Sequence, residues 1–388
     1  MTSPPLSLYV HLPWCVKKCP YCDFNSYSLG QADPRSRYLD ALTRDLALEA
    51  ARVPDRPLTS IFLGGGTPSL FSPAEIGRVL DCVAQHYRLV DDIEITMEAN
   101  PGTVECGTPA GYRRAGVNRL SIGAQSFSPA ALSLLGRIHS SDDIVRAFGE
   151  ARDAGFEQIN LDVMYGLPQQ GIDAALVDIE QALALEPPHF SWYQLTLEPN
   201  TVFYARPPAG LPDNDLSLEL QMAGQALLAS RGYEQYEVSA YARPGARCRH
   251  NLNYWQFGDY LAAGAGAHGK LTIDGAVRRY AKPANPQAYM ALLEDEQAAE
   301  PMELAPPLSG RDLCFEFLLN ALRLADGFDE QLFVERTGLP GPWHAALFRA
   351  MTLASGGRQS VGGTSSTTSQ ASFWIEGLCT RCGTRLYS

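Results

Sequence analysis

The stretch CVKKCPYCDFN, residues 15–25, sets three cysteines in C-x3-C-x2-C spacing directly after an apolar run, LSLYVHL at 6–12. Phe24 stands where a further thiol could follow, and no obvious fourth ligand lies nearby. A structural zinc site usually needs four ligands, commonly two C-x2-C pairs or one pair with two histidines. In a four-iron cluster, by contrast, three thiolates can hold three irons and leave the fourth open. The spacing therefore favours an iron–sulfur cluster, with zinc and a cofactor-free loop as alternatives.

The composition around this stretch is that of an ordinary globular protein. The net charge is −12 and no block of Lys and Arg stands out, which argues against nucleic acid as a partner. The N-terminus has neither a basic start nor a sustained apolar run, and no later segment reaches the ~18 apolar residues of a membrane span. The 9 cysteines are odd in number and scattered, so we expect a cytoplasmic protein with metal or redox chemistry rather than disulfides.

Short apolar runs alternate with polar loops and helical patterns through the first half of the chain. A good helix is predicted at 34–52 and another at 73–86, where Ser72 and Glu75 have capping-box spacing. Such alternation is typical of a parallel sheet covered by helices, either an α/β barrel or a doubly wound sheet. The six expected strands are 6–12, 59–65, 93–99, 118–124, 158–166 and 189–197.

The unusual residues follow these strands. After strand one comes the cysteine loop, and the later strands are followed by GGGTP, EANP, GAQSF, DVMYGLP and LEPN. In α/β barrels the active site lies at the carboxyl ends of the strands. The pattern changes after about residue 210, which predicts a barrel at 1–210 and a smaller, mostly helical region at 211–351. Residues 352–388 are rich in Ser, Thr and Gly, so we expect a disordered or aberrant tail.

The cysteine run, together with a Gly-rich loop after the second strand, resembles the radical S-adenosylmethionine (SAM) superfamily. The resemblance implies a partial six-unit (β/α) barrel, with SAM chelated to the open iron of a [4Fe-4S] cluster. Further motifs resemble the branch that contains oxygen-independent coproporphyrinogen III dehydrogenase and a related haem chaperone. These motifs are YVHLPWCVKKCPYCDFNSY, FLGGGTPS, MEANPG, GVNRLSIGAQSF, DVMYGLPQQ, HNLNYW and GAHGK.

The resemblance implies roles for individual residues. The three cysteines match the cluster ligands, Tyr9 and His11 match residues that flank the cluster and SAM, and Glu98 matches an acid that contacts the ribose. Taken alone, each polar residue could equally be a strand-end cap or part of a surface ion pair; their shared barrel face favours a site. The residues implied as cluster or SAM contacts are Cys15, Cys19, Cys22, Tyr9, Gly64, Gly65, Gly66, Thr67, Glu98, Gln125, Arg137 and Asp162.

Phe24 separates the two members of that branch. The dehydrogenase has a further cysteine at this position and an N-terminal extension, and this sequence has neither. The resemblance therefore favours the haem chaperone. It implies that the protein binds haem and delivers it to acceptor haemoproteins such as respiratory-chain enzymes, including any at the membrane. It also implies a homodimer. The alternative is the dehydrogenase reaction, the radical SAM decarboxylation of coproporphyrinogen III to protoporphyrinogen IX.

The HNLNYW motif, residues 250–255, is a further marker of the chaperone. Neutral imidazole commonly ligates haem iron, so His250 is a candidate axial ligand, and a helix-capping role is its alternative. Cys248 is a weaker rival, and His268 in GAHGK is either close to the cofactor or an ordinary loop residue. Cys82 and Cys314 are predicted to be buried in apolar packing. The CTRC pair at 379–382 could bind zinc only with two further ligands, and no ligands with matching spacing are found in the sequence.

Overall fold

The computed structural model describes residues 3–30, 33–102, 106–295 and 303–340. The tail expected at 352–388 and the CTRC pair lie outside these residues. Six neighbouring strands run parallel and follow chain order across one sheet, which confirms the six predicted units. They are β1 (Leu6–Leu12), β4 (Leu58–Gly65), β5 (Leu89–Ala99), β6 (Arg119–Gln125), β7 (Gln158–Tyr165) and β8 (His189–Gln194).

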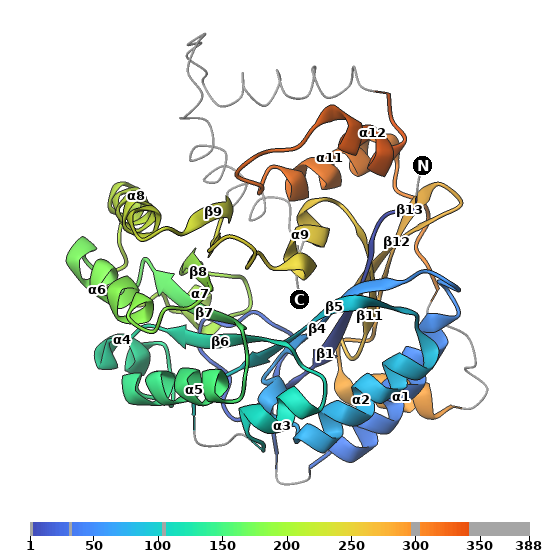
Figure 1. Ribbon diagram of the computed structural model, residues 1–388, viewed down its shortest axis with the longest axis horizontal. Coiled ribbons are helices and arrows are strands. Elements are labelled where there is room, and N and C mark those ends of the chain that lie inside the picture. The colour runs from blue at the N-terminus through green and yellow to red at the C-terminus, as the bar shows by residue number, and fades with distance from the viewer. Residues whose placement is uncertain (1–2, 31–32, 103–105, 296–302, 341–388) are drawn as a thin grey trace.

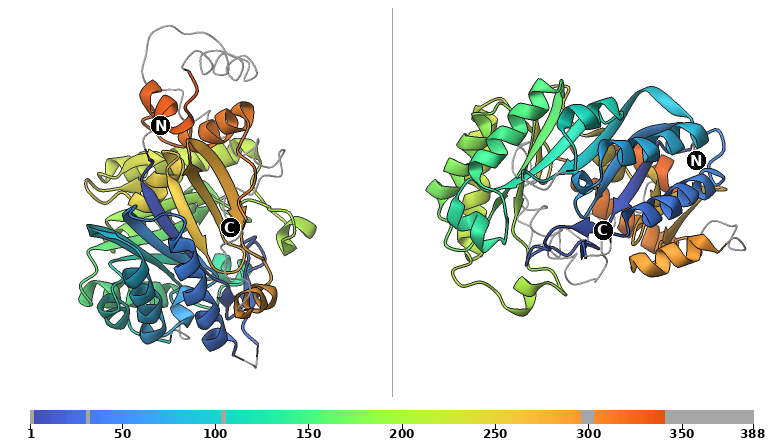
Figure 2. Two further views of the ribbon diagram at one scale, coloured as in Figure 1. Left: turned by 90° about the vertical axis from the view of Figure 1, so that its right-hand side faces the viewer. Right: turned by 90° about the horizontal axis from the view of Figure 1, so that it is seen from below.

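Helices line the outer side of the curved sheet, as Figures 1 and 2 show. The predicted capping box of α2 is present, because the Ser72 side chain accepts from the Glu75 backbone N–H and the Glu75 carboxylate accepts from the Ser72 N–H. The inner side of the arc is left for polar side chains and for the loops that follow the strands. These helices are α1 (Arg35–Ala50), η1 (Pro68–Leu70), α2 (Pro73–His86), α3 (Pro109–Arg114), α4 (Pro129–Leu134), α5 (Ser141–Asp153) and α6 (Ile172–Leu183).

The region after residue 210 contains the expected helices and, in addition, strands that the sequence interpretation did not include. Strand β11 pairs in parallel with β1, and β10 pairs antiparallel with β8, so both edges of the six-stranded sheet are extended. One sheet thus crosses the predicted boundary. The elements from residue 202 onward are α7 (Val202–Ala205), α8 (Asn214–Ser230), β9 (Glu234–Glu237), β10 (Ala240–Ala242), α9 (Arg249–Trp255), β11 (Asp259–Ala263), β12 (His268–Ile273), β13 (Ala276–Ala281), α10 (Pro286–Glu294), α11 (Gly310–Ala321) and α12 (Glu330–Thr337).

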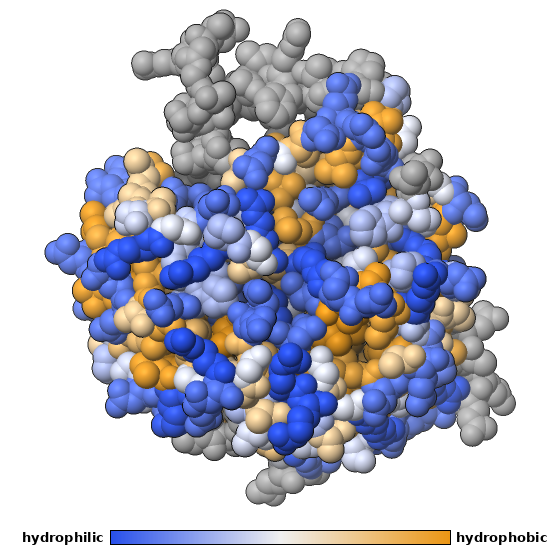
Figure 3. All heavy atoms as spheres, in the orientation of Figure 1, coloured by the Kyte–Doolittle hydropathy of each residue, from blue (hydrophilic) through white to orange (hydrophobic). Residues whose placement is uncertain are grey.

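The two largest apolar cores of the described residues hold most of these elements together. The larger core lies between the sheet and its outer helices and includes Cys82, as predicted. A smaller one, around Phe317, joins α11 and α12 to the chain near Phe257 and includes the predicted buried Cys314. On the face seen in Figure 3, apolar side chains form several separate areas among polar ones. No helix of the described residues is both long and apolar enough to cross a membrane.

Candidate functional site

The cysteine loop is closed at its base by a short strand pair. Strand β2 (Trp14–Cys15) pairs with β3 (Tyr27–Ser28), and the Leu29 N–H donates to the Cys15 carbonyl at 2.9 Å. Within the loop the Cys22 N–H donates to the Cys19 carbonyl at 3.2 Å. The loop therefore has a fixed base and a tight turn between its second and third cysteines, which holds the three thiols on one short segment.

All three cysteines line one cavity of about 520 Å³ at the carboxyl ends of the parallel strands. Burial raises the pKa of Cys15, and it raises that of Cys22 to about 11, while the nearby Lys18 charge acts in the opposite direction. Iron must therefore displace protons from these thiols when it binds. No three His, Cys, Asp or Glu side chains in the described residues converge on one metal-ion position. Three thiols that line one cavity are suited to a cluster, in which each thiolate can hold a different iron.

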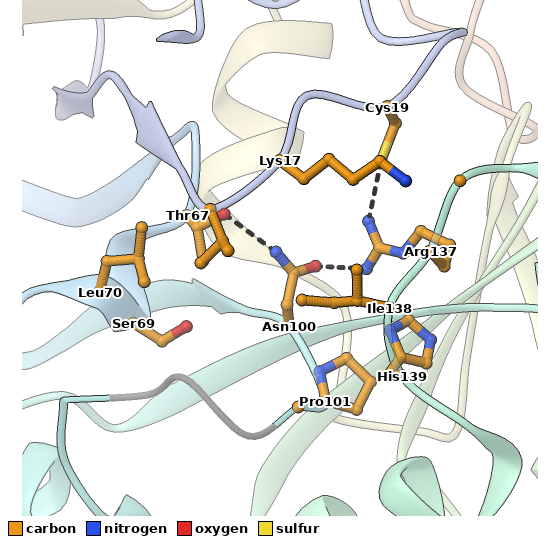
Figure 4. Close-up of a pocket in the computed structure, with 13 residues that line it drawn as sticks. Lys17, Cys19, Thr67, Ser69, Leu70, Asn100, Pro101, Arg137, Ile138 and His139 are labelled. Carbon is orange, nitrogen blue, oxygen red and sulfur yellow. Dashed lines mark hydrogen bonds between the residues drawn. The ribbon is translucent and has the colours of Figure 1, made fainter. Parts of the chain in front are cut away.

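Arg137 connects the cysteine loop to the strand ends. Its guanidinium donates to the Cys19 sulfur at 3.7 Å, to the Gly123 carbonyl at 2.9 Å and to the Asn100 amide oxygen. Asn100 in turn donates to the Thr67 hydroxyl at 3.0 Å, and Figure 4 shows this chain of contacts. A buried guanidinium beside a sulfur stabilises negative charge there, and a planar fork can also take a carboxylate.

The glycine loop after β4 is needed for close packing of the chain. Gly65 has φ +112°, and a Cβ there would lie 2.5 Å from the His11 ring; a Cβ on Gly66 would lie 2.5 Å from the Trp14 carbonyl oxygen. The N–H groups of Gly66 and Thr67 donate to the Leu12 and Trp14 carbonyls at 2.8 and 2.7 Å. These glycines therefore pack the end of β4 against β1 and the start of the cysteine loop.

Two buried carboxyl groups face the same cavity. The pKa of Glu98 is raised to about 7, mainly by burial and also by the charge of Asp162. A hydrogen bond of 3.1 Å from the Gly65 N–H lowers this pKa and so opposes the rise. Burial also raises the pKa of Asp162, against hydrogen bonds from Ser121 at 3.0 Å and Asn160 at 2.7 Å. The Arg119 charge also lowers the pKa of Asp162, but no ion pair to either acid occurs among the residues that the structure describes. Two such acids are suited to a ligand that brings hydroxyl groups or positive charge.

Gln125 is aimed into this cavity by an irregularity in β6. Its φ is +68°, in the left-handed region that non-glycine residues rarely adopt, and the pairing of β6 with β7 shifts between Ile122 and Gln125. The Tyr193 hydroxyl donates to the Gln125 amide oxygen and fixes the side chain. Strain of this kind persists where the surroundings impose it, commonly at ligand sites.

A second cavity, of about 690 Å³, adjoins the first. Glu98 and Phe24 line both, so the two share a wall. Aromatic and aliphatic side chains dominate the second cavity, and Arg279 is a cation on its wall, paired with Glu316. The lining residues are Tyr9, Phe24, Phe62, Gly65, Glu98, His250, Asn251, Tyr254, Trp255, Tyr260, His268, Arg279, Leu308, Asp312, Phe315, Glu316 and Leu319.

The predicted site residues thus divide between the two cavities. The cysteines lie in the first cavity together with Gly66, Thr67, Gln125, Arg137 and Asp162, while Tyr9, Gly65 and His250 lie in the second. Cys248 lines neither; it is fully buried beside Glu94, and burial raises the pKa of its thiol to about 12. A buried protonated thiol is a poor iron ligand, which argues against Cys248 as the rival.

Comparison with known proteins defines the family. Residues 9–181 match the Radical SAM superfamily. The heme chaperone HemW of Escherichia coli is 49% identical over 339 residues, which cover 87% of each chain. That of Bacillus subtilis is 38% identical over 68% of this chain and 71% of the relative. The chain belongs to the HemW family. The solved structure of coproporphyrinogen III oxidase (HemN) from E. coli has a TM-score of 0.79 at 24% identity, covering 97% of this chain and 89% of its own. That likeness confirms the fold.

Sequence reasoning missed three residues of this HemW-family site. Asn100 joins Arg137 to Thr67, Tyr193 fixes Gln125, and Asn25 donates to the Ala265 carbonyl at 2.9 Å and to the Ala284 carbonyl at 2.8 Å. Asn100 follows a strand end in EANP and could have been selected by position. Nothing local indicates the partners of Asn25, which lie 240 and 259 residues further along the chain.

We expect Glu98→Gln to stabilise the cluster-free, ligand-free chain at alkaline pH. The folded-state pKa of about 7 lies above the unfolded value of 4.5, so folding binds a proton between these values, and stability falls as pH rises through that window. Full ionisation costs on the order of 3 kcal/mol at ~1.4 kcal/mol per pKa unit, and the glutamine avoids this cost.

Urea unfolding at pH 5 and pH 8 measures the effect. At pH 5 the Glu98→Gln variant and the parent should unfold at similar urea concentrations, and at pH 8 the variant should be the more stable. Equal stability at both pH values would contradict the expected ionisation of Glu98. The Glu75→Gln variant, which changes an acid in the capping box of α2 outside both cavities, controls for the general effect of removing a carboxylate.

Proposed function

We propose that the protein is a haem chaperone that carries a [4Fe-4S] cluster and SAM in the first cavity and haem in the second, and that it passes haem to acceptor haemoproteins. The observation that carries the proposal is the aromatic-lined 690 Å³ cavity, which shares Glu98 and Phe24 with the cysteine cavity in a chain of the HemW family. A volume of this size is within the ~300–1,000 Å³ typical of cofactor pockets.

The first cavity suits the cluster and SAM on chemical grounds. Cys15, Cys19 and Cys22 would hold three irons, and when bound, the cluster with SAM would supply one-electron chemistry. The chain's own side chains would orient the ligand: Arg137 could meet a carboxylate as a fork, and Glu98 could accept from ribose hydroxyls. Gln125, held by Tyr193, and Asp162 would add polar contacts in the same cavity.

The second cavity suits a porphyrin. Phe62, Tyr254 and Trp255 present rings that can stack on a flat macrocycle, and Phe24 is 41% exposed at the shared wall. The guanidinium of Arg279 could meet a propionate, in competition with Glu316. His250 and Tyr9 would form part of the binding wall. Acceptors at the membrane and a homodimer are part of the same proposal.

A haemin titration of the anaerobically reconstituted full chain, followed by Soret absorbance, tests the proposal. We expect saturable binding near one haem per chain, because one cavity of suitable size and lining lies beside the cysteine cavity. Trp255→Ala removes a wall ring and should weaken binding about tenfold, since an aromatic contact contributes roughly 1 kcal/mol or more. Trp192→Phe, a change in the main core outside both cavities, is the matched control.

Two outcomes would contradict the proposal. Weak, non-saturable binding of haemin that the Trp255→Ala change leaves unaltered would exclude a defined haem site. Formation of a vinyl-containing porphyrinogen from coproporphyrinogen III, under anaerobic conditions with SAM and a reductant, would favour the dehydrogenase reaction instead.

A further inference from the structure

Two imidazoles line the 690 Å³ cavity, and they differ in how they could reach a bound iron. We propose that His268 is the axial ligand of haem iron and that His250 instead positions Tyr254 in the cavity wall. This inference rests on the proposed function, because it names the residue through which the same cavity would hold its cargo.

His250 is enclosed on both of its nitrogens. Its side chain is 1% exposed, Nδ1 lies 3.0 Å from the Ser60 hydroxyl, and Nε2 lies 3.0 Å from the Tyr254 hydroxyl. The ring also packs against Phe62 at 5.1 Å between centroids. To ligate iron, the imidazole would have to break a buried hydrogen bond and rotate within a packed site, which leaves Ser60 or Tyr254 without its partner. His250 is therefore suited to hold the Tyr254 side chain in place by a hydrogen bond.

His268, by contrast, presents its side chain to the cavity from a rigid element. It is exposed and is the first residue of β12, where it pairs with Ala281 of β13. The preceding loop turns through Gly264 and Gly266, at φ +103° and +81°. An accessible imidazole on a strand held by backbone pairing is a good ligand, because little conformational freedom is lost when iron binds.

The position of His268 also connects the haem cavity to the cysteine loop. Asn25, three residues after Cys22, donates to the Ala265 carbonyl, three residues before His268, at 2.9 Å. A second bond from the same amide reaches Ala284 at 2.8 Å. His268 therefore begins its strand three residues after a point that is fixed to the cysteine loop.

The phenols that line the cavity are weaker candidates. Burial raises the pKa of Tyr9 well above its usual value, which disfavours the phenolate needed for ligation. The Tyr254 hydroxyl bonds to His250, and the Tyr260 hydroxyl accepts from Arg279. No cysteine or methionine lines this cavity among the described residues. An imidazole nitrogen from His268 thus remains the ligand that this geometry favours.

The test compares iron-containing and iron-free porphyrin on the full, anaerobically reconstituted chain. The variants are His268→Ala, His250→Ala and His86→Ala, the last being an exposed histidine at the end of α2 that controls for adsorption to surface imidazole. We expect His268→Ala to weaken haemin binding at least tenfold and to remove the histidine signature from the electron paramagnetic resonance spectrum. Added free imidazole should restore that signature, because it can enter the space left by the side chain.

Protoporphyrin IX, which has no iron, should bind the parent chain and His268→Ala with similar affinity. His268→Met keeps a side chain of similar reach and should give a methionine-type spectrum, so the idea can be tested even if the alanine variant folds poorly. A histidine signature that persists in both His268 variants and disappears in His250→Ala would overturn the inference. Failure of the parent chain to bind either porphyrin saturably would instead overturn the proposed function and, with it, the inference.

Discussion

Replacing Cys19 with serine should abolish cluster assembly. The hydroxyl is a poor ligand for iron compared with a thiolate, and one of the three thiols that the described residues place in the cavity would be lost. Arg137, which donates to the Cys19 sulfur, would also lose this contact. Iron bound after anaerobic reconstitution should fall from about four per chain to near zero. Iron analysis together with the visible absorption of the cluster provides the measurement.

Cys106→Ser is the matched control for this change. Cys106 is exposed and lines neither of the two cavities, and the Arg35 guanidinium donates to its sulfur at 3.3 Å. It should retain the full iron content. If Cys19→Ser also bound the parental amount of iron, the three cysteines could not be the ligand set, and the proposed cluster site would have to be abandoned.

Replacing Lys282 with methionine should have the largest effect on stability. Lys282 is buried after β13 and binds two buried acids of α1, Asp45 and Glu49, the latter at 2.7 Å. Methionine keeps the volume but leaves both carboxylates without this cation, although Arg52 still reaches Glu49 at 2.9 Å. Removing one partner of a buried ion pair typically costs about 3–5 kcal/mol. Urea unfolding followed by circular dichroism at neutral pH measures the loss.

The exposed pair between Arg37 and Glu294 supplies the comparison, because it joins α1 to the same part of the chain but is open to solvent. Arg37→Ala should leave the unfolding midpoint nearly unchanged, since exposed pairs contribute little. Equal unfolding midpoints for Arg37→Ala and Lys282→Met would show that the buried network does not hold α1 to the C-terminal region. Asp45→Asn combined with Lys282→Met should recover part of the loss, because it removes one of the unpaired charges.

The sequence predicted those features that repeat along the chain. Apolar runs mark the six parallel strands β1 and β4 to β8, and the positions of the loops that follow them predicted a site at their carboxyl ends. The individual residues Glu98 and Arg137 were implied by the family resemblance rather than by position. The strands at the sheet edges were missed because β9 and β10 have four and three residues, and β12 and β13 form a hairpin within a Gly-rich stretch. Strands as short as β9 and β10 carry too few alternating residues to be separated from loops.

The environment of individual side chains could not be predicted in the same way. The motif HNLNYW indicated a site, but the enclosure of His250 depends on Ser60, which is 190 residues away in the sequence. The left-handed backbone of Gln125 likewise accompanies a shift in the pairing of β6 with β7, and no residue in GAQSF predicts that shift. Both are consequences of long-range packing, which fixes local geometry that a sequence pattern leaves open.

The two hydrogen bonds from Asn25 also set the order in which the protein can be completed during synthesis. The cysteine loop is among the first segments made, yet the carbonyl groups of Ala265 and Ala284 that anchor it are 240 and 259 residues away. At roughly 5–20 residues per second, translation leaves the loop without these anchors for on the order of 10–50 s. Cluster loading during this interval would meet an unanchored loop, so the anchored site can form only after Ala265 and Ala284 have been made.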